Sequence, residues 1–73
     1  MATMTGTVAR NTEISARSEK SFEDAIELGI ARATETLRNV ESAWVKEQKV
    51  YVGDGKIATY QVDLVVTFVL DES

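Results

Sequence analysis

The sequence predicts an α+β domain of order β-α-β-β, with one helix packed on one face of a three-stranded antiparallel sheet. Three observations carry this prediction. Apolar residues recur at helical spacing between residues 18 and 39, a Gly-Asp-Gly turn joins two runs rich in β-branched residues, and the last run keeps one apolar face at every second position. A chain of 73 residues has room for one domain only.

The first predicted element is a strand over residues 7–15, and its pattern is the weakest of the four. Val8 and Ile14 are apolar, whereas Arg10 and Glu13 dilute the alternation. Strand propensity by itself is a modest guide in such a segment. The preceding residues 1–6 offer little to bury, so we expect a disordered tail in front of a single domain over residues 7–73.

The second predicted element is a helix over residues 18–39. Ser18 and Ser21 are both candidate N-caps, and Ser21 with Asp24 three residues later has the spacing of a short capping box. Small residues such as Gly29 keep the apolar stripe thin, which allows the helix to lie close to a sheet. The stripe consists of Phe22, Ile26, Gly29, Ile30, Ala33, Leu37 and Val40.

The last two elements are strands over residues 42–52 and 56–70, joined at Gly53-Asp54-Gly55. A short turn of this composition between β-branched runs is a strong hairpin signal. The final strand predicts the core face most clearly. Its apolar face holds Ala58, Tyr60, Val62, Leu64, Val66, Phe68 and Leu70, and its mixed face holds Thr59, Gln61, Asp63, Val65, Thr67 and Val69.

One helix covers one face of such a sheet and leaves the other face uncovered. We expect Trp44, Val50, Val65 and Val69 on the uncovered face. A small monomer rarely exposes such an apolar surface, and a domain of this size usually needs disulfides, a metal or oligomerisation for support. Disulfides are excluded because the chain has no cysteine. A second copy of the chain is therefore the expected cover.

Composition excludes most familiar catalytic machinery. The chain has neither cysteine nor histidine, so it has no cysteine nucleophile, no Ser-His-Asp triad and no thiolate or imidazole metal site. The net charge of −4 argues against a nucleic-acid partner. No apolar run approaches the length of a membrane span, and the first residues lack the features of a secretory signal. Cytoplasmic localisation is the expectation, with no membrane partner.

The remaining candidates for chemistry are carboxylates and the glycine turn. Glu47, Asp63, Asp71 and Glu72 could bind a hard cation or act as an acid–base pair, but their spacing matches no known loop. We therefore expect solvated charge at strand edges. The Gly-Asp-Gly turn precedes a strand rather than a helix, which indicates a hairpin and not a phosphate loop. No catalytic residue and no metal ligand is predicted, and the protein is not expected to be an enzyme.

Trp44 and Gln61 are the residues that favour a bound ligand. Ala43 and Val45 are expected to face the helix, which places the Trp44 indole on the uncovered face, and alternation places Gln61 there too. An aromatic plane and a planar amide suit a flat heteroaromatic molecule, since the ring stacks and the amide supplies a donor and an acceptor. The alternative is that Trp44 fills a subunit interface and Gln61 is polar sheet surface.

The chain resembles the dodecins, small flavin-binding proteins of β-α-β-β fold that assemble as hollow dodecamers. The resemblance covers about residues 8–71 and needs no gap between Thr36 and Leu70. It is carried by Ser18-Glu19-Lys20-Ser21-Phe22-Glu23-Asp24-Ala25-Ile26, Ala31-Arg32-Ala33, Thr36-Leu37-Arg38-Asn39, Val45-Lys46-Glu47-Gln48, Gly55-Lys56, Tyr60-Gln61-Val62 and Phe68-Val69-Leu70.

The resemblance implies a homododecamer that stores a small molecule without catalysis, with flavin (FMN or riboflavin) as the cofactor. Gln61 matches the glutamine that contacts flavin in the family. The position of the stacking tryptophan falls on Ser42, and Trp44 lies two residues further along, about 6.6 Å away on the same face of a strand. The resemblance thus implies a ligand site at Gln61, Trp44 and Ser42. The alternative is a flavin-free dodecin-like assembly that binds cations such as calcium.

Overall fold

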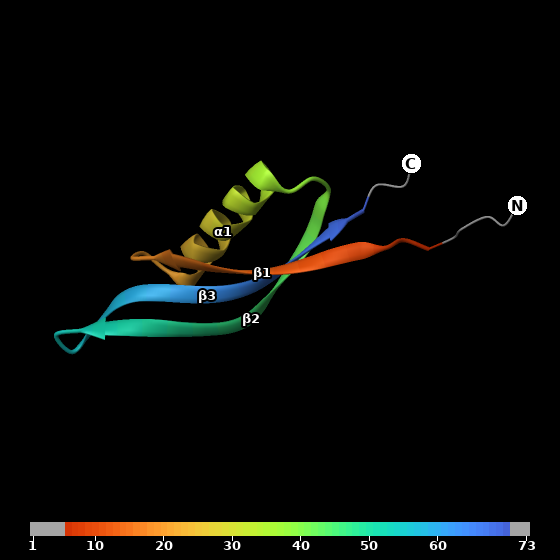
Figure 1. Ribbon diagram of the computed structural model, residues 1–73. Helices are drawn as coiled ribbons and strands as arrows, with labels where there is room; N and C mark the ends of the chain where they lie inside the picture. The colour runs from red at the N-terminus through yellow and green to blue at the C-terminus, as the bar shows by residue number, and fades with distance from the viewer. Residues whose placement is uncertain (1–5, 71–73) are drawn as a thin grey trace, which may run out of the picture.

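The computed structural model describes residues 6–70, which fold into one helix and three strands. The elements are β1 (Ala9–Ser18), α1 (Phe22–Thr36), β2 (Val40–Gly53) and β3 (Lys56–Val69). The strands form one antiparallel sheet in the order β1-β3-β2, and α1 lies on one face of it (Figure 1). The predicted fold class is confirmed. The predicted tail, residues 1–6, lies outside the described residues except for Gly6, so the division into tail and domain stays a prediction.

The first strand is longer than predicted and the helix is shorter. Strand β1 continues to Ser18, because it pairs with the central strand β3 as far as the pair Ser18–Tyr60. Ser21 is the N-cap of α1, and its Oγ accepts a hydrogen bond from the Asp24 N–H at 2.9 Å. Ser18 is no cap, since its Oγ donates to Asp24 Oδ2 at 2.6 Å and so ties β1 to the first turn of the helix.

The helix ends at Thr36, three residues before the predicted end. Leu37 is already extended, with φ −114° and ψ 142°, and Asn39 has a left-handed φ of 61°. Asparagine tolerates this conformation better than most residues. The Val69 N–H donates to the Asn39 carbonyl at 3.0 Å, which fixes the turn against the end of β3. Leu37 and Val40 therefore reach the core from the connection and from β2, not from the helix.

The core lies between α1 and the central strand. Val62, Leu64 and Val66 are at most 1 % exposed, which confirms the predicted apolar face of the last strand. Small helix residues pack against them: Ala25, Gly29 and Ala33 are all buried. A Cβ atom on Gly29 would lie 2.9 Å from Leu64 Cδ1 and 3.1 Å from Ala16 Cβ. The helix thus sits so close to the sheet that a Cβ atom at this position would force its neighbours to move.

A β-bulge in the middle of β2 puts the residues before it and after it out of phase. Trp44 pairs with Val65 and Val45 with Leu64, after which the register shifts and Glu47 pairs with Asp63. Lys46 is the extra residue, and it reverses the parity of the residues from Glu47 to Tyr51; two further register shifts lie near the ends of β2, between Val40 and Ser42 and between Tyr51 and Val52. Val50 consequently pairs with Tyr60 on the helix face. Its predicted place on the uncovered face is wrong, whereas Trp44, Val65 and Val69 lie there as predicted.

Replacing Gly29 with alanine is expected to destabilise the protein. The added methyl group meets Leu64 and Ala16 at distances that force the neighbours to move, and overpacking of this kind costs about 1–3 kcal/mol. Alanine has a higher helix propensity than glycine, and this offsets about 1 kcal/mol of the loss in stability. We expect a net loss of about 1 kcal/mol in the free energy of unfolding, measured by chemical denaturation. Glu27→Ala, at an exposed position of the same helix, is the control, and a Gly29→Ala variant at least as stable as wild type would contradict the packing described.

Candidate functional site

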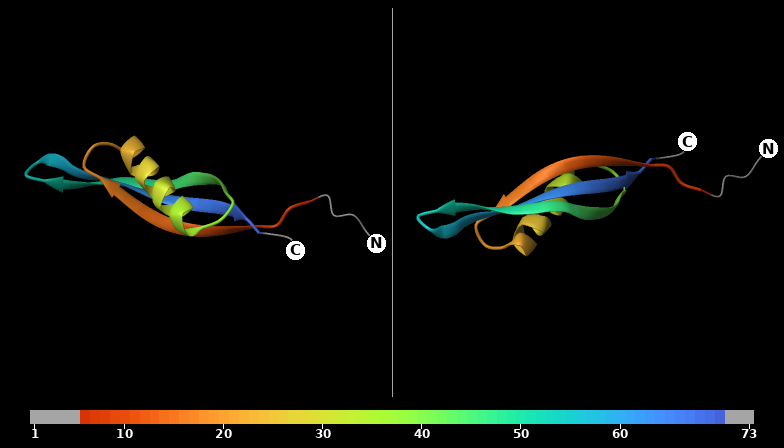
Figure 2. Two further views of the ribbon diagram at one scale, coloured as in Figure 1. Left: turned by 90° about the horizontal axis from the view of Figure 1, so that it is seen from above. Right: turned by 90° about the horizontal axis from the view of Figure 1, so that it is seen from below.

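The sheet face opposite α1, hereafter the open face, is turned toward the viewer in the view from below, with the helix behind the strands (Figure 2, right). The strand registers place one set of residues there from each strand. They are Asn11, Glu13, Ser15 and Arg17 from β1, Gln61, Asp63, Val65 and Thr67 from β3, and Ser42, Trp44, Glu47, Lys49 and Tyr51 from β2.

Gln61 lies at the centre of a hydrogen-bond network on the open face. Its Oε1 accepts from Arg17 Nε at 2.7 Å and from the Tyr51 hydroxyl at 2.9 Å. Its Nε2 donates to Asp63 Oδ1 at 3.0 Å. The residue is only 6 % exposed, although no helix or strand described within residues 6–70 lies over this face. The amide is therefore a buried, oriented group rather than simple polar sheet surface.

Arg17 and Tyr51 form the wall around this amide. Besides its bond to Gln61, Arg17 donates from Nη2 to the Tyr51 hydroxyl at 3.0 Å, and its guanidinium lies 4.9 Å from the centre of the Tyr51 ring. The Lys49 ammonium lies 5.2 Å from the same ring. Two cations close to one aromatic ring hold it by cation–π attraction. Sequence reasoning missed Arg17 and Tyr51 as partners of Gln61. Alternation without the bulge puts Tyr51 on the helix face.

Asp63 corrects the expectation of a solvated carboxylate. It lies on the central strand, and its Oδ1 accepts from Ser15 Oγ at 2.7 Å as well as from Gln61. The hydrogen bonds from Ser15 and Gln61 lower the pKa of Asp63 below its ordinary value of 3.8 against the opposing effect of desolvation. Glu47 is exposed as predicted, and the predictions for Asp71 and Glu72 fall outside the described residues.

Trp44 and Ser42 lie on the open face at some distance from Gln61. Trp44 pairs with Val65, four residues along β3 from Gln61, which corresponds to about 13 Å. Ser42 pairs with Thr67, six residues along, or about 20 Å. The structure thus brings Ser42 and Trp44 together and separates both from Gln61 within one chain.

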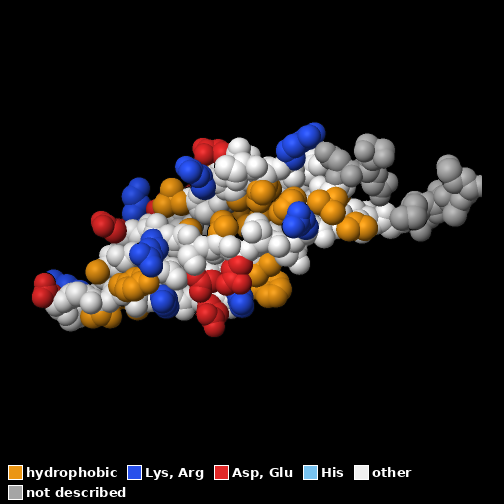
Figure 3. Space-filling model, viewed as in Figure 1, with side chains coloured by type: hydrophobic (Ala, Val, Ile, Leu, Met, Phe, Trp, Pro, Cys, Tyr) orange, Lys and Arg blue, Asp and Glu red, His pale blue; other side chains and the backbone are white. Residues whose placement is uncertain are grey.

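Large apolar side chains reach the surface in several places. Trp44 is 59 % exposed on the open face, and Val52 and Ile57 are 68 % and 53 % exposed at the end of the β2–β3 hairpin. This end extends past the last paired residue of β1, and Figure 3 shows hydrophobic side chains gathered there. Such patches on a chain this small indicate contact surfaces.

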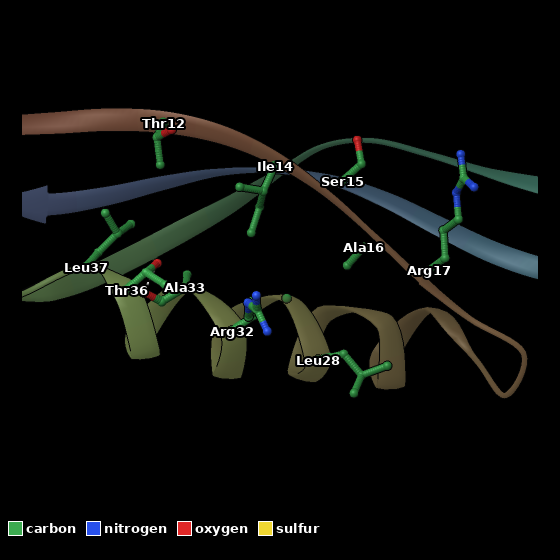
Figure 4. A pocket seen from close by; sticks show the side chains of 11 residues that line it. Thr12, Ile14, Ser15, Ala16, Arg17, Leu28, Arg32, Ala33, Thr36 and Leu37 are labelled. Carbon is green, nitrogen blue, oxygen red and sulfur yellow. Dashed lines mark hydrogen bonds between the residues drawn. The ribbon is translucent and has the colours of Figure 1, made fainter.

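A groove of about 470 Å³ runs between α1 and the edge strand β1 (Figure 4). It lies on the helix side of the sheet, and its lining includes neither Gln61, Trp44 nor Ser42. Arg17 contributes to its wall, but the remaining lining is mostly small or apolar. Its residues are Thr12, Ile14, Ser15, Ala16, Arg17, Leu28, Gly29, Arg32, Ala33, Thr36 and Leu37. The open face, which holds the oriented polar groups, is the better candidate for specific recognition.

Two further features were sought in the part of the chain that the structure describes. Among residues 6–70, no group of three or more acidic side chains comes together in a way that could hold a metal ion. The helix described in this range is not long and apolar enough to cross a membrane.

Comparison with known proteins assigns the family. The sequence profile of the dodecins matches residues 8–71. The chain is 38 % identical to dodecin from Thermus thermophilus over 68 residues, which cover 93 % of this chain and 99 % of that protein. The chain belongs to the dodecin family. The family predicted from sequence is therefore confirmed.

Solved dodecin structures share the whole architecture. Dodecin from Streptomyces coelicolor superposes with a TM-score of 0.88 at 31 % identity, covering 96 % of this chain and all of that one. The calcium dodecin from Mycobacterium tuberculosis, described as calcium-chelating with a novel calcium-binding site, superposes with a TM-score of 0.77 at 32 % identity, covering 92 % of this chain and 96 % of that one. All four elements of this dodecin thus have counterparts in the family.

The lowered pKa of Asp63 predicts a loss of stability in acid. The ionised carboxylate stabilises the fold above pH 3.8, and this contribution disappears as the pH falls through the lower pKa of the folded state. We expect Asp63→Asn to melt below wild type near pH 7, and the difference in melting temperature to shrink below about pH 4. Asp54→Asn, in the exposed hairpin turn, controls for the loss of one carboxylate. A difference that stays constant from pH 7 to pH 3 would argue against the role of ionised Asp63.

Proposed function

We propose that this dodecin forms a hollow homododecamer in the cytoplasm and binds flavin, as FMN or riboflavin, or a related flat ligand. The ligand is held and stored on the open face without being converted. The observation that carries the proposal is the amide of Gln61, which lies in an oriented network on the sheet face that α1 leaves uncovered. A buried, oriented polar group beside exposed aromatic and apolar surface is typical of a small-molecule site.

The exposed apolar surface supports assembly. Trp44, Val52 and Ile57 are each more than half exposed, and Leu28 beside the groove is 51 % exposed. In a 73-residue chain without disulfides, covering such surface with further copies is the expected source of additional stability. Homododecamers are the characteristic assembly of the dodecin family, and the close match in fold supports the same assembly here.

The distances on the open face favour a ligand site shared between copies. Gln61 and Trp44 are separated by about 13 Å along the strands, so the two residues are not neighbours within one chain. We therefore expect a ligand that stacks on Trp44 of one copy to take its polar contact from Gln61 of another, in a site that the assembled shell completes.

Storage without catalysis agrees with the state of the polar groups. The carboxylate of the network, Asp63, has a lowered pKa and two hydrogen-bond donors, which makes it a poor general base near neutral pH. Arg17 and Tyr51 direct their donors at Gln61. These groups are arranged to orient a ligand.

The alternative is a flavin-free shell that binds cations. It is favoured by the likeness to the calcium dodecin of Mycobacterium tuberculosis. Within residues 6–70 of this chain, however, the acidic side chains form no group suited to a metal ion. Calcium titration of the same protein samples distinguishes the two functions.

Assembly is tested by mass. Static light scattering at micromolar concentration is expected to give a value near twelve times the 8.0 kDa of one chain. The double variant Val52→Asp/Ile57→Asp is expected to lower this mass, because charged side chains at the hairpin end oppose its burial in a contact between subunits. A mass near that of one chain for the wild type would refute the assembly.

Flavin binding is tested by titrating riboflavin and FMN into wild type, Ser42→Trp and Trp44→Ala, with quenching of flavin fluorescence as the signal. The wild type is expected to bind, and Trp44→Ala to bind more weakly because a stacking plane is lost. Ser42→Trp restores the family's aromatic position. Stacking of a base on an aromatic side chain is worth roughly 1–3 kcal/mol, which corresponds to an affinity gain of about five- to a hundredfold.

The outcome separates the two proposed functions. If none of the three proteins quenches flavin fluorescence, the flavin site is refuted and the cation-binding alternative is tested by calcium calorimetry. If wild type and Trp44→Ala bind equally, flavin is held without the indole, and Trp44 is a contact residue of the shell.

A further inference from the structure

The amide of Gln61 has a fixed orientation, and this limits what it offers a ligand. A carbonyl oxygen has two lone pairs, and both are used, by Arg17 Nε and by the Tyr51 hydroxyl. The amide nitrogen carries two protons, and one is given to Asp63. Within residues 6–70, the second proton is the one hydrogen-bonding function of this side chain that has no partner.

Rotating the amide by half a turn would break the whole network. Nε2 would then face the Arg17 N–H, and Oε1 would face the Asp63 carboxylate, so that donor meets donor and acceptor meets acceptor. The Tyr51 hydroxyl would lose the acceptor of its proton, because it would face Nε2, which can only donate, while it still accepts from Arg17 Nη2 at 3.0 Å. The charges of Arg17 and Asp63 both oppose the rotation, and charged partners make the stronger hydrogen bonds.

We propose that Gln61 meets its ligand as a hydrogen-bond donor only, locked in this orientation by Arg17, Tyr51 and Asp63, so that the site selects a ligand edge lined with acceptor atoms. This corrects the sequence-based expectation that the amide supplies both a donor and an acceptor. The inference rests on the proposed function and specifies its recognition chemistry. The pyrimidine edge of oxidised flavin carries two carbonyl oxygens and therefore meets the requirement. Arg17, Tyr51 and Asp63 act as positioning residues.

The donor role is tested by two substitutions of Gln61 with different hydrogen-bonding ability. Gln61→Met keeps the length of the side chain and removes its hydrogen bonds, whereas Gln61→Glu offers acceptors alone. If the amide donates, riboflavin binds Gln61→Glu no better than Gln61→Met, and both bind it about three- to tenfold more weakly than wild type, the value of one hydrogen bond. Binding by Gln61→Glu that equals or exceeds wild-type binding would overturn the inference.

The positioning role is tested with a matched pair of tyrosine variants. Tyr51→Phe removes the hydroxyl that donates to Gln61 and keeps the ring beside Arg17. Tyr60→Phe is the control, because Tyr60 lies on the helix face and packs edge-on against Phe22 at 5.1 Å. The ligands are riboflavin and its 2-thio and 4-thio analogues, in which a weakly accepting sulfur replaces one carbonyl oxygen.

Wild type and Tyr60→Phe are expected to prefer riboflavin over at least one thio analogue by about three- to tenfold, the value of one hydrogen bond. Tyr51→Phe is expected to lose most of this preference, a change that a general loss of stability does not produce. Equal discrimination by Tyr51→Phe and wild type would overturn the positioning role. A wild type that binds riboflavin without any preference refutes this inference alone, whereas a wild type that binds no flavin refutes the proposed function together with it.

The orientation itself is measurable without a ligand. The chain has two glutamines, Gln48 and Gln61, so glutamine labelled with ¹⁵N gives two side-chain amide groups in NMR spectra. Gln48 is exposed and serves as the internal reference. We expect one Gln61 amide proton to exchange with solvent at least tenfold more slowly than those of Gln48, and the protection to fall in Tyr51→Phe. Equal exchange at the two glutamines would show that the amide is not locked.

Discussion

One helix can cover one face of a three-stranded sheet, and the rest of the molecule follows from this constraint. Gly29 lets α1 lie directly on Leu64, so the covered face of the central strand is filled by small and branched side chains. The opposite face has no such cover. Its central strand carries Gln61 and Asp63 where a second layer of the same chain would have demanded apolar residues. The one-sided core is what leaves room for a recognition surface.

The bulge at Lys46 determines which side chains of β2 reach that surface. Before it, Trp44 is on the open face and Val45 on the helix face; after it, Lys49 and Tyr51 are on the open face. Without the extra residue, Tyr51 would point toward the helix and Gln61 would lose a donor. One inserted residue thus serves packing and recognition together, since the same change of parity places Val50 with Tyr60 on the helix face.

Local patterns were sufficient to predict most of the fold. The alternation in the last strand identified the buried face, and the serine three residues before Asp24 identified the helix N-cap. The helix end was predicted too late, because Leu37 and Val40 continue the helical spacing although Asn39 turns the chain. Spacing alone cannot distinguish an apolar residue within a helix from one that comes after the helix and also packs on the core.

The candidate site was predictable only in part. Gln61 and Trp44 were placed on the correct face by alternation. The partners of Gln61 were not found, because Arg17 comes from a strand with a weak pattern and Tyr51 is moved by a bulge that no glycine or proline marks. The distance between Gln61 and Trp44 depends on the register of two strands, which is a property of their pairing and not of either segment.

Within residues 6–70, five apolar residues form the buried core, and this small number has a consequence for each newly made chain. A core this small leaves the isolated subunit with little stability of its own, so in the proposed shell the folded state draws on contacts between copies. Its melting temperature then rises with protein concentration by mass action. Between synthesis and incorporation, Val52 and Ile57 remain open to solvent and to proteases. The abundance of the protein in a cell would accordingly follow how fast subunits meet as much as how well each one folds.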